Sequence, residues 1–155
     1  MGRVRWRLPR RRAARIVLLD PEDRVLLFRL EAMSDPDGRG YWYLPGGGIR
    51  PRESPASAAA RELREETGIR EVELGGVIGQ LSSVRFVLRG REIVQDEWYV
   101  AGRVASPRVG VGRGHDGERD TVTGFRWWSA SDLAATTEVV FPPGLVELVE
   151  LALGG

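Results

Sequence analysis

The sequence predicts an α+β protein, within the broad α/β class, in which helices pack on a mixed β-sheet. Three observations support this class: β-prone segments arranged as hairpins, segments with helical periodicity or helix caps, and the mixing of both kinds along one chain. Hydrophobic residues make up 42% of the 155 residues, which is enough for one core in a chain of ordinary domain length. We therefore expect one domain over residues 1–155.

The N-terminal part of the chain predicts a strand hairpin. Residues 1–14 alternate arginines with apolar residues, and we interpret them as an edge strand or a basic arm. The apolar segments 15–20 and 24–29 follow, separated by Pro21-Glu22-Asp23, which has the composition of a turn. These two segments should pair as antiparallel strands.

The middle of the chain predicts a short strand, a glycine turn and a helix. Tyr41–Leu44 is aromatic and β-prone, and it enters a turn at Pro45–Gly48. Ser54 can cap free amides, a proline follows at the first helical position, and Gly68 stands where a helix would end. The helix should cover about Pro55 to Thr67.

The second half of the chain predicts another hairpin and a loop. Residues 72–88 and 92–104 are mostly β-prone, with Arg89-Gly90-Arg91 as the hairpin tip. The glycine-rich segment at about 102–123 should be a flexible loop. Phe125–Trp128 predicts one more strand.

Two C-terminal helices are expected. Ser129 and Asp132 have the spacing of a capping box that opens a short helix. From Pro143 to Leu153 the apolar residues fall on one helical face and the glutamates on the other, which predicts an amphipathic helix.

Composition restricts the classes of function. No segment approaches the roughly 20 apolar residues of a membrane span, and no secretory signal is visible, so we expect a cytoplasmic protein with no membrane partner. The 23 basic and 22 acidic residues nearly cancel, which makes nucleic acid an unlikely main partner. Without cysteine, a metal must be held by oxygen or by His115, which we interpret as an ordinary loop residue.

The predicted helix at 55–67 carries a stripe of carboxylates. At about 100° per residue, Glu65 and Glu66 lie within roughly 60° of Glu62 on the helical wheel. Like charges at this spacing destabilise a bare helix, and a hard divalent cation such as Mg²⁺ would offset them. The stripe alone is also typical of a solvated face paired with Arg61 and Arg64, so the surrounding segment has to decide between the two.

The surrounding segment has a defined spacing. From Gly47 it contains a glycine, five residues, Glu53, seven residues, Arg61-Glu62-Leu63, one residue, Glu65-Glu66, one residue, and Gly68-Ile69. This pattern resembles the Nudix box at every defined position. The resemblance implies the Nudix fold, a mixed β-sheet sandwiched between α-helices, and hydrolysis of a diphosphate linkage.

The resemblance also implies roles for the box residues. Glu62, Glu65 and Glu66 match the family's metal-binding and catalytic carboxylates, which implies Mg²⁺, or alternatively Mn²⁺, as the cofactor. The structural residues of the box are Gly47, Glu53, Arg61 and Gly68. Of these, Glu53 and Arg61 match residues that brace the box loops by pairing, and the glycines permit tight turns.

The general base is open between three residues. Glu62 is one candidate, because a carboxylate beside the metal can remove a proton from water. Many family members use an acidic residue from a late loop instead, and Glu118 or Asp120 would match that position. Of these two, Glu118 is our first candidate.

The substrate is expected to be a small nucleotide-like molecule. Aromatic rings and arginine suit a base and its phosphates, and the candidates are Arg29, Trp42 and Tyr43. The default is a nucleoside di- or triphosphate or a nucleotide-linked metabolite, since no subfamily signature outside the box favours another substrate. Two alternatives are a non-catalytic nucleotide sensor and an RNA 5′-end pyrophosphohydrolase that uses the basic N-terminus. A homodimer is compatible with each of these.

Overall fold

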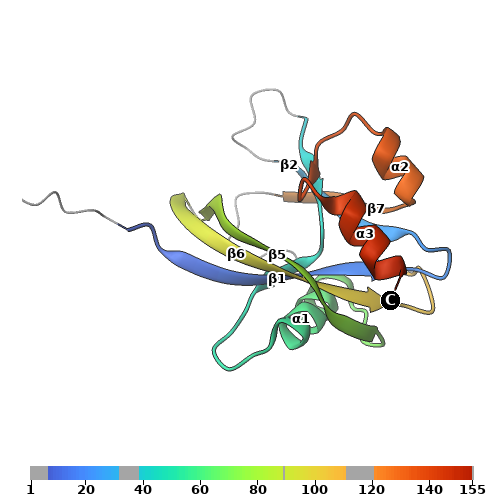
Figure 1. Ribbon diagram of the computed structural model, residues 1–155, viewed down its shortest axis with the longest axis horizontal. Coiled ribbons are helices and arrows are strands. Elements are labelled where there is room, and N and C mark those ends of the chain that lie inside the picture. The colour runs from blue at the N-terminus through green and yellow to red at the C-terminus, as the bar shows by residue number, and fades with distance from the viewer. Residues whose placement is uncertain (1–6, 32–38, 89, 111–120, 155) are drawn as a thin grey trace, which may run out of the picture.

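In the described part of the chain, one mixed β-sheet of eight strands packs with three helices (Figure 1). The computed structural model describes residues 7–31, 39–88, 90–110 and 121–154. The strands pair in the order β5-β6-β1-β2-β3-β8, with β4 on β1 and β7 on β2. The strands are β1 (Arg10–Leu19), β2 (Val25–Glu31), β3 (Tyr41–Tyr43), β4 (Gly46–Gly48), β5 (Glu73–Leu88), β6 (Arg91–Arg103), β7 (Thr121–Trp128) and β8 (Val140–Phe141). The helices are α1 (Pro55–Thr67), α2 (Ala130–Ala135) and α3 (Leu145–Leu153).

The sheet lies between helices, as the fold-class prediction requires. Along β1, Ala14, Ile16 and Leu18 pack into the cluster that contains the buried residues of α1. Val17 and Leu19 point the other way, into the cluster that contains residues of α2 and α3. This alternation follows from the two-residue period of a strand. Figure 1 shows α1 on the opposite side of the sheet from α3.

β1 is a central strand from residue 13 onward, where it pairs on both sides, and this corrects the edge-strand interpretation for residues 13 and 14. It pairs in parallel with β6 along its whole length, from Arg10 opposite Val94 to Leu19 opposite Arg103. Its other side pairs with β2 and β4. The arginine-rich composition suggested an edge, but β6, from a distant part of the chain, covers one side of β1, and β2 and β4 pair with its other side. Residues 1–6 lie outside the described residues.

The helix predictions are confirmed. α1 has the expected bounds, with the Ser54 side chain accepting a hydrogen bond from the Ser57 amide and Gly68 in the left-handed conformation. α2 opens with the predicted Ser129–Asp132 capping box. α3 begins at Leu145 rather than Pro143, because residues 142–144 form a turn in which the Leu145 amide donates to Pro142 O.

Two segments differ from the expected loops. The expected turn at Pro45–Gly48 contains strand β4, in which Gly46–Gly48 pair with residues 13–15 of β1. Part of the expected loop at 102–123 is regular structure, because β6 continues to Arg103 and β7 begins at Thr121. Residues 104–110 are attached to the rest of the protein by two backbone hydrogen bonds. The Val104 amide donates to Leu19 O and the Gly110 amide donates to Thr67 O, each at 2.9 Å.

None of the described helices is long and apolar enough to cross a membrane.

Candidate active site

The helix α1 and the strand β4 together position the box carboxylates. Leu63, Ala58 and Ala59 are fully buried against the sheet, which fixes the rotation of the helix. The acidic stripe therefore lies at the margin of the packed face, beside β4. Glu66 Oε1 accepts a hydrogen bond of 3.1 Å from the Gly46 amide. The local sequence thus presents a carboxylate to the backbone of the neighbouring strand.

Gly47 has no room for a side chain because the Glu62 carboxylate occupies that space. A Cβ at Gly47 would lie 2.6 and 2.8 Å from the two carboxylate oxygens of Glu62. Gly46 has a different constraint, since its φ of 152° belongs to the glycine region and a Cβ there would collide with the Ala14 carbonyl. The glycines of β4 therefore allow α1 to approach closely enough for Glu62 and Glu66 to face adjacent residues.

Arg61 connects the two loops and the helix of the box. Its Nε and Nη2 each donate to a different oxygen of Glu53 at 2.8 Å, a bidentate pair. Nη2 also donates to Gly48 O at 2.9 Å. Nη1 contacts Glu62 at 3.0 Å and Glu65 at 3.4 Å. The geometry supports the bracing role expected for Arg61 and Glu53.

These contacts shift the ionisation of the pair. Hydrogen bonds from Arg61 and from the Arg50 amide lower the pKa of Glu53 to about 2. The hydrogen bond to Glu53 raises the pKa of Arg61 above its ordinary value, against the effect of burial. Both groups are therefore charged throughout the physiological pH range.

The donor set suits a hard divalent cation. Glu62 and Glu65 both contact Nη1 of Arg61, so the two carboxylates lie within reach of a common cation. Carboxylate oxygens with water and substrate phosphate are the ligands that Mg²⁺ accepts. Among the described residues, however, no three acidic or histidine side chains are already grouped closely enough to enclose an ion.

Two of the three predicted substrate contacts, Trp42 and Tyr43, are buried and offer no open surface. Trp42 is 8% exposed and packs edge-on against Trp128, while Tyr43 is 5% exposed and packs against Phe28. Burial of both rings argues against base stacking on Trp42 or Tyr43, because neither ring offers a free face. Arg29 is half-buried between Trp42, Glu138 and the Arg39 carbonyl. The late-loop candidates Glu118 and Asp120, and also His115, lie outside the described residues.

Sequence reasoning did not single out Arg15 and Glu97, which form a buried ion pair of 3.2 Å between β1 and β6. Arg15 also lies close enough to Glu66 for their charges to interact. The available signal was a charged residue at an inward position of each predicted strand, next to strongly apolar neighbours.

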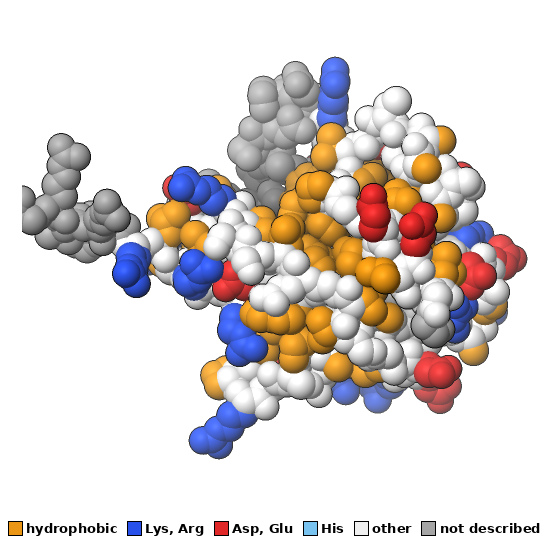
Figure 2. Space-filling view, in the orientation of Figure 1, with side chains coloured by type: hydrophobic (Ala, Val, Ile, Leu, Met, Phe, Trp, Pro, Cys, Tyr) orange, Lys and Arg blue, Asp and Glu red, His pale blue; other side chains and the backbone are white. Residues whose placement is uncertain are grey.

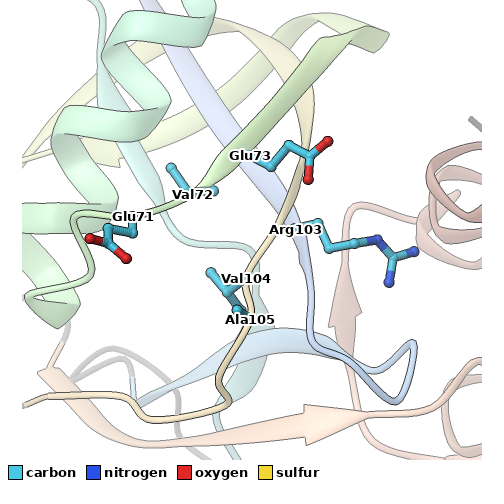
Figure 3. Close-up of a pocket in the computed structure, with 6 residues that line it drawn as sticks. All are labelled: Glu71, Val72, Glu73, Arg103, Val104 and Ala105. Carbon is cyan, nitrogen blue, oxygen red and sulfur yellow. The ribbon is translucent and has the colours of Figure 1, made fainter.

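A separate pocket of about 420 Å³ opens between the start of β5 and the end of β6 (Figure 3). Figure 3 shows Glu71, Val72 and Glu73 on one side, facing Arg103, Val104 and Ala105. It contains none of the box carboxylates. We therefore assign it no part in the candidate site.

Comparison with known proteins supports the family. The model of the NUDIX domain matches residues 9–149. Over 70 residues the chain is 46% identical to an RNA pyrophosphohydrolase of Bartonella henselae, a match that covers 43% of this chain and 40% of the relative. Over 142 residues it is 30% identical to diphosphoinositol polyphosphate phosphohydrolase 3-beta of Bos taurus, covering 86% of this chain and 72% of the relative. The chain thus matches less than half the length of the bacterial relative.

Solved structures share the fold. The dihydroneopterin triphosphate pyrophosphohydrolase of E. coli superposes with a TM-score of 0.65 at 20% identity, covering 97% of this chain and 100% of that chain. A MutT protein from Methanosarcina mazei superposes with a TM-score of 0.63 at 23% identity, covering 96% of each chain. The box geometry, the match over residues 9–149 and the shared fold lead to one conclusion: the chain belongs to the Nudix family.

Proposed function

We propose that the protein is a divalent-cation-dependent hydrolase of a diphosphate linkage in a nucleotide-like molecule. The observation that carries the proposal is the placement of Glu62 and Glu66 against adjacent glycines of β4, with Glu65 sharing Arg61. Three carboxylates at the margin of the core create a local excess of negative charge. A cation and the phosphates that it binds would balance that charge.

Each residue has a distinct part in the proposed reaction. Glu65 and Glu66 would hold Mg²⁺, or Mn²⁺, which supplies charge neutralisation at the phosphate oxygens and activates water. Glu62 would hold the cation or accept the water proton at a carboxylate oxygen; Glu118 and Asp120 are the alternative bases. Arg61 would hold the Glu62 carboxylate and Gly48 of β4 in fixed positions relative to α1. The substrate would bind beside β4; Arg29 lies over Trp42 of the layer opposite α1 and is not assigned to this site.

A substrate panel tests this proposal. Purified protein is incubated with nucleoside di- and triphosphates and nucleotide-linked metabolites, with Mg²⁺, with Mn²⁺ and with excess chelator, and products are identified by mass in ¹⁸O-water. We expect turnover only with a cation, and incorporation of ¹⁸O on one phosphorus. The matched variants are Glu65→Gln in the site and Glu150→Gln on the exposed face of α3. Full turnover in chelator would exclude the mechanism, and binding without product would favour the sensor alternative.

The alternative of an RNA 5′-end substrate has one structural observation in its favour. The start of β1, the end of β5 and the start of β6 project from the body, and arginine side chains gather there (Figures 1 and 2). Arg10 is paired with Asp96, and Arg85 with Glu92. Arg12 instead lies over the Trp98 ring at 5.0 Å, and this combination of cation and aromatic ring suits a single strand.

Salt dependence separates the two substrate classes. If RNA is bound along this surface, its affinity should fall steeply between low and physiological salt, and Arg12→Ala should reduce the slope by about one. A mononucleotide substrate predicts similar KM values for a triphosphorylated RNA and for the free nucleotide. Equal KM values together with a flat salt response would remove the RNA alternative.

A further inference from the structure

We propose that Arg15, held in place by Glu97, is a positioning residue that orients the Gly46 backbone and through it the Glu66 carboxylate. The inference rests on the proposed function, in which Glu66 is a metal ligand. It adds two residues that lie outside the Nudix box, on β1 and β6.

The first step is the rigidity of the Arg15 guanidinium. Its Nε donates to Glu97 Oε1 at 3.2 Å, and the two side chains are only 13% and 3% exposed. Glu97 is itself fully engaged, because Gln95 Nε2 donates to Oε1 at 2.8 Å and the Tyr99 hydroxyl donates to Oε2 at 2.7 Å. Burial and the nearby Glu97 charge raise the pKa of Tyr99, so its hydroxyl remains a donor. A buried arginine fastened this way has little rotational freedom.

The second step is the contact between Arg15 and the box. Nη1 of Arg15 donates to Gly46 O at 3.4 Å and to Leu44 O at 3.5 Å, and the guanidinium lies over the Tyr43 ring. The amide of the same Gly46 donates to Glu66 Oε1 at 3.1 Å. Arg15 therefore holds the peptide that follows Gly46, while the peptide before it holds Glu66.

The third step is charge. Arg15 lies near enough to Glu66 to feel its negative charge, in addition to that of Glu97. Strand pairing with residue 15 of β1 fixes the Gly46 backbone at a φ of 152°, and the Arg15 guanidinium adds a charged contact to the same residue. The fixed Arg15 guanidinium therefore restricts the Gly46 amide and the Glu66 carboxylate that accepts a hydrogen bond from this amide.

A purely stabilising role accounts less well for the pair. Burying two charges costs free energy that their attraction only partly returns, and apolar pairs of similar volume often stabilise a fold equally well. Gln95 and Tyr99 donate to Glu97, and the Gly46 carbonyl accepts from Arg15, so the pair belongs to a polar network that extends from β6 to β4. The ion pair instead stands where β1 pairs with β4, at residue 15 opposite Gly46.

The test uses the double variant Arg15→Met/Glu97→Met, because removal of Arg15 alone would leave Glu97 buried without its partner. Mn²⁺ binding to the metal-free protein is titrated by electron paramagnetic resonance, and the melting temperature is measured on the same preparation. We expect a protein that still folds but melts at a lower temperature, because the Gln95 amide and the Tyr99 hydroxyl lose their acceptor. Well below that temperature, its Mn²⁺ affinity should be weaker by at least about 10-fold, the usual effect of losing a group that orients a ligand. The control Arg103→Met removes an ion pair from β6 outside the box and should keep wild-type Mn²⁺ affinity.

The outcomes separate this inference from the proposed function. If the wild-type protein binds no Mn²⁺ and hydrolyses nothing, the proposed function fails. If the wild-type protein binds Mn²⁺ and turns over substrate, and the double variant binds Mn²⁺ equally well, only the positioning role is overturned. If the double variant unfolds, Glu97→Gln supplies the second measurement, since it keeps the volume and one acceptor oxygen but removes the charge that fixes Arg15; the Tyr99 hydroxyl then accepts from the new amide instead of donating. Unchanged Mn²⁺ affinity in that variant also overturns the role.

Discussion

At the scale of single residues, Glu62 and Glu66 occupy different environments although both belong to the same acidic stripe. Glu62 rests against Gly47 and accepts a hydrogen bond from Arg61. Glu66 accepts from the Gly46 amide and lies near Arg15. An arginine beside each carboxylate limits the repulsion that their spacing would otherwise cause.

Gly47→Ala should separate activity from stability. Its new Cβ would push the Glu62 carboxylate aside, and because this is the end of a flexible side chain the fold can accommodate the shift. Displacement by about 1 Å can cost roughly 100-fold in rate, so we expect kcat to fall by that order while the melting temperature stays unchanged or rises slightly. Gly76→Ala is the matched control, because nothing lies within 4 Å of its added Cβ. Normal kcat in Gly47→Ala would contradict a catalytic placement of Glu62.

Glu66→Gln should lose at least roughly 100-fold in turnover, since one charge for the cation is removed while size is kept. From the sequence, relief of repulsion with Glu62 predicts equal or slightly higher stability of the metal-free protein. The nearby Arg15 opposes this gain, so we now expect no increase. Turnover at saturating Mg²⁺ and metal-free melting, measured together, check both statements. Near-normal turnover would remove Glu66 from the site.

At the scale of elements, α1 is fixed in three ways: by its caps, by its buried face and by the Arg61 contacts. The caps and the apolar face set its ends and its rotation. Arg61 then joins the helix to Glu53 before it and to Gly48 of β4. Arg61 therefore contacts both the loop that precedes α1, through Glu53, and the carboxylates of Glu62 and Glu65.

Arg61→Ala should lower stability by roughly 2–3 kcal/mol, because Glu53 and the Gly48 carbonyl would lose a partly buried charged partner. Activity should fall further than stability alone explains, since Glu62 and Glu65 lose a shared contact. Denaturant unfolding and kcat at a temperature well below melting provide the two measurements. Arg64→Ala, an exposed arginine on the same helix, is the control. Wild-type melting and kinetics in Arg61→Ala would exclude the bracing role.

Acid should weaken the box through Glu53. Its pKa is lowered in the fold from an ordinary value of 4.5 to about 2, so the stabilisation is complete above about pH 4.5 and is lost as the pH falls toward 2. We expect the difference in unfolding free energy between wild type and Glu53→Gln to shrink over this range. A difference that is independent of pH between 5 and 2 would contradict the pairing; urea unfolding at several pH values measures it.

At the scale of the whole molecule, the sheet separates two packed layers with different roles. The α1 layer carries the carboxylates, and the layer of α2 and α3 packs against the opposite face. Strands β1 and β6 are neighbours in the sheet between the two layers, and they carry the ion pair of Arg15 and Glu97.

Val149→Ala in α3 should therefore act on stability alone. Val149 is fully buried in the second layer, and deleting two methyl groups should cost about 2 kcal/mol. Metal affinity and kcat measured well below the melting temperature should remain those of the wild type. A clear loss of metal affinity in this variant, while the protein is fully folded, would mean that the two layers are coupled more strongly than their packing implies.

Local sequence determined the helices, the hairpins and the box. Capping residues such as Ser54, Gly68 and Ser129 act over four or five residues, so their effect can be read without knowing the fold. The spacing from Gly47 to Ile69 likewise placed the carboxylates on one helical face. These features depend on neighbours along the chain.

Only the tertiary structure decided which strands pair. It also decided which of the predicted site residues are buried and which residues contact one another. β1 is central because β6, about 80 positions later, pairs with it, and no local pattern reports such a partner. Strands β4 and β8 have three and two residues and form only where a longer strand receives them. Trp42 and Tyr43 are buried rather than open to substrate. Arg15 lies beside Glu97, Gly46 and Glu66. Both findings depend on the pairing of segments that are remote in the sequence, because this pairing sets burial and distance in space.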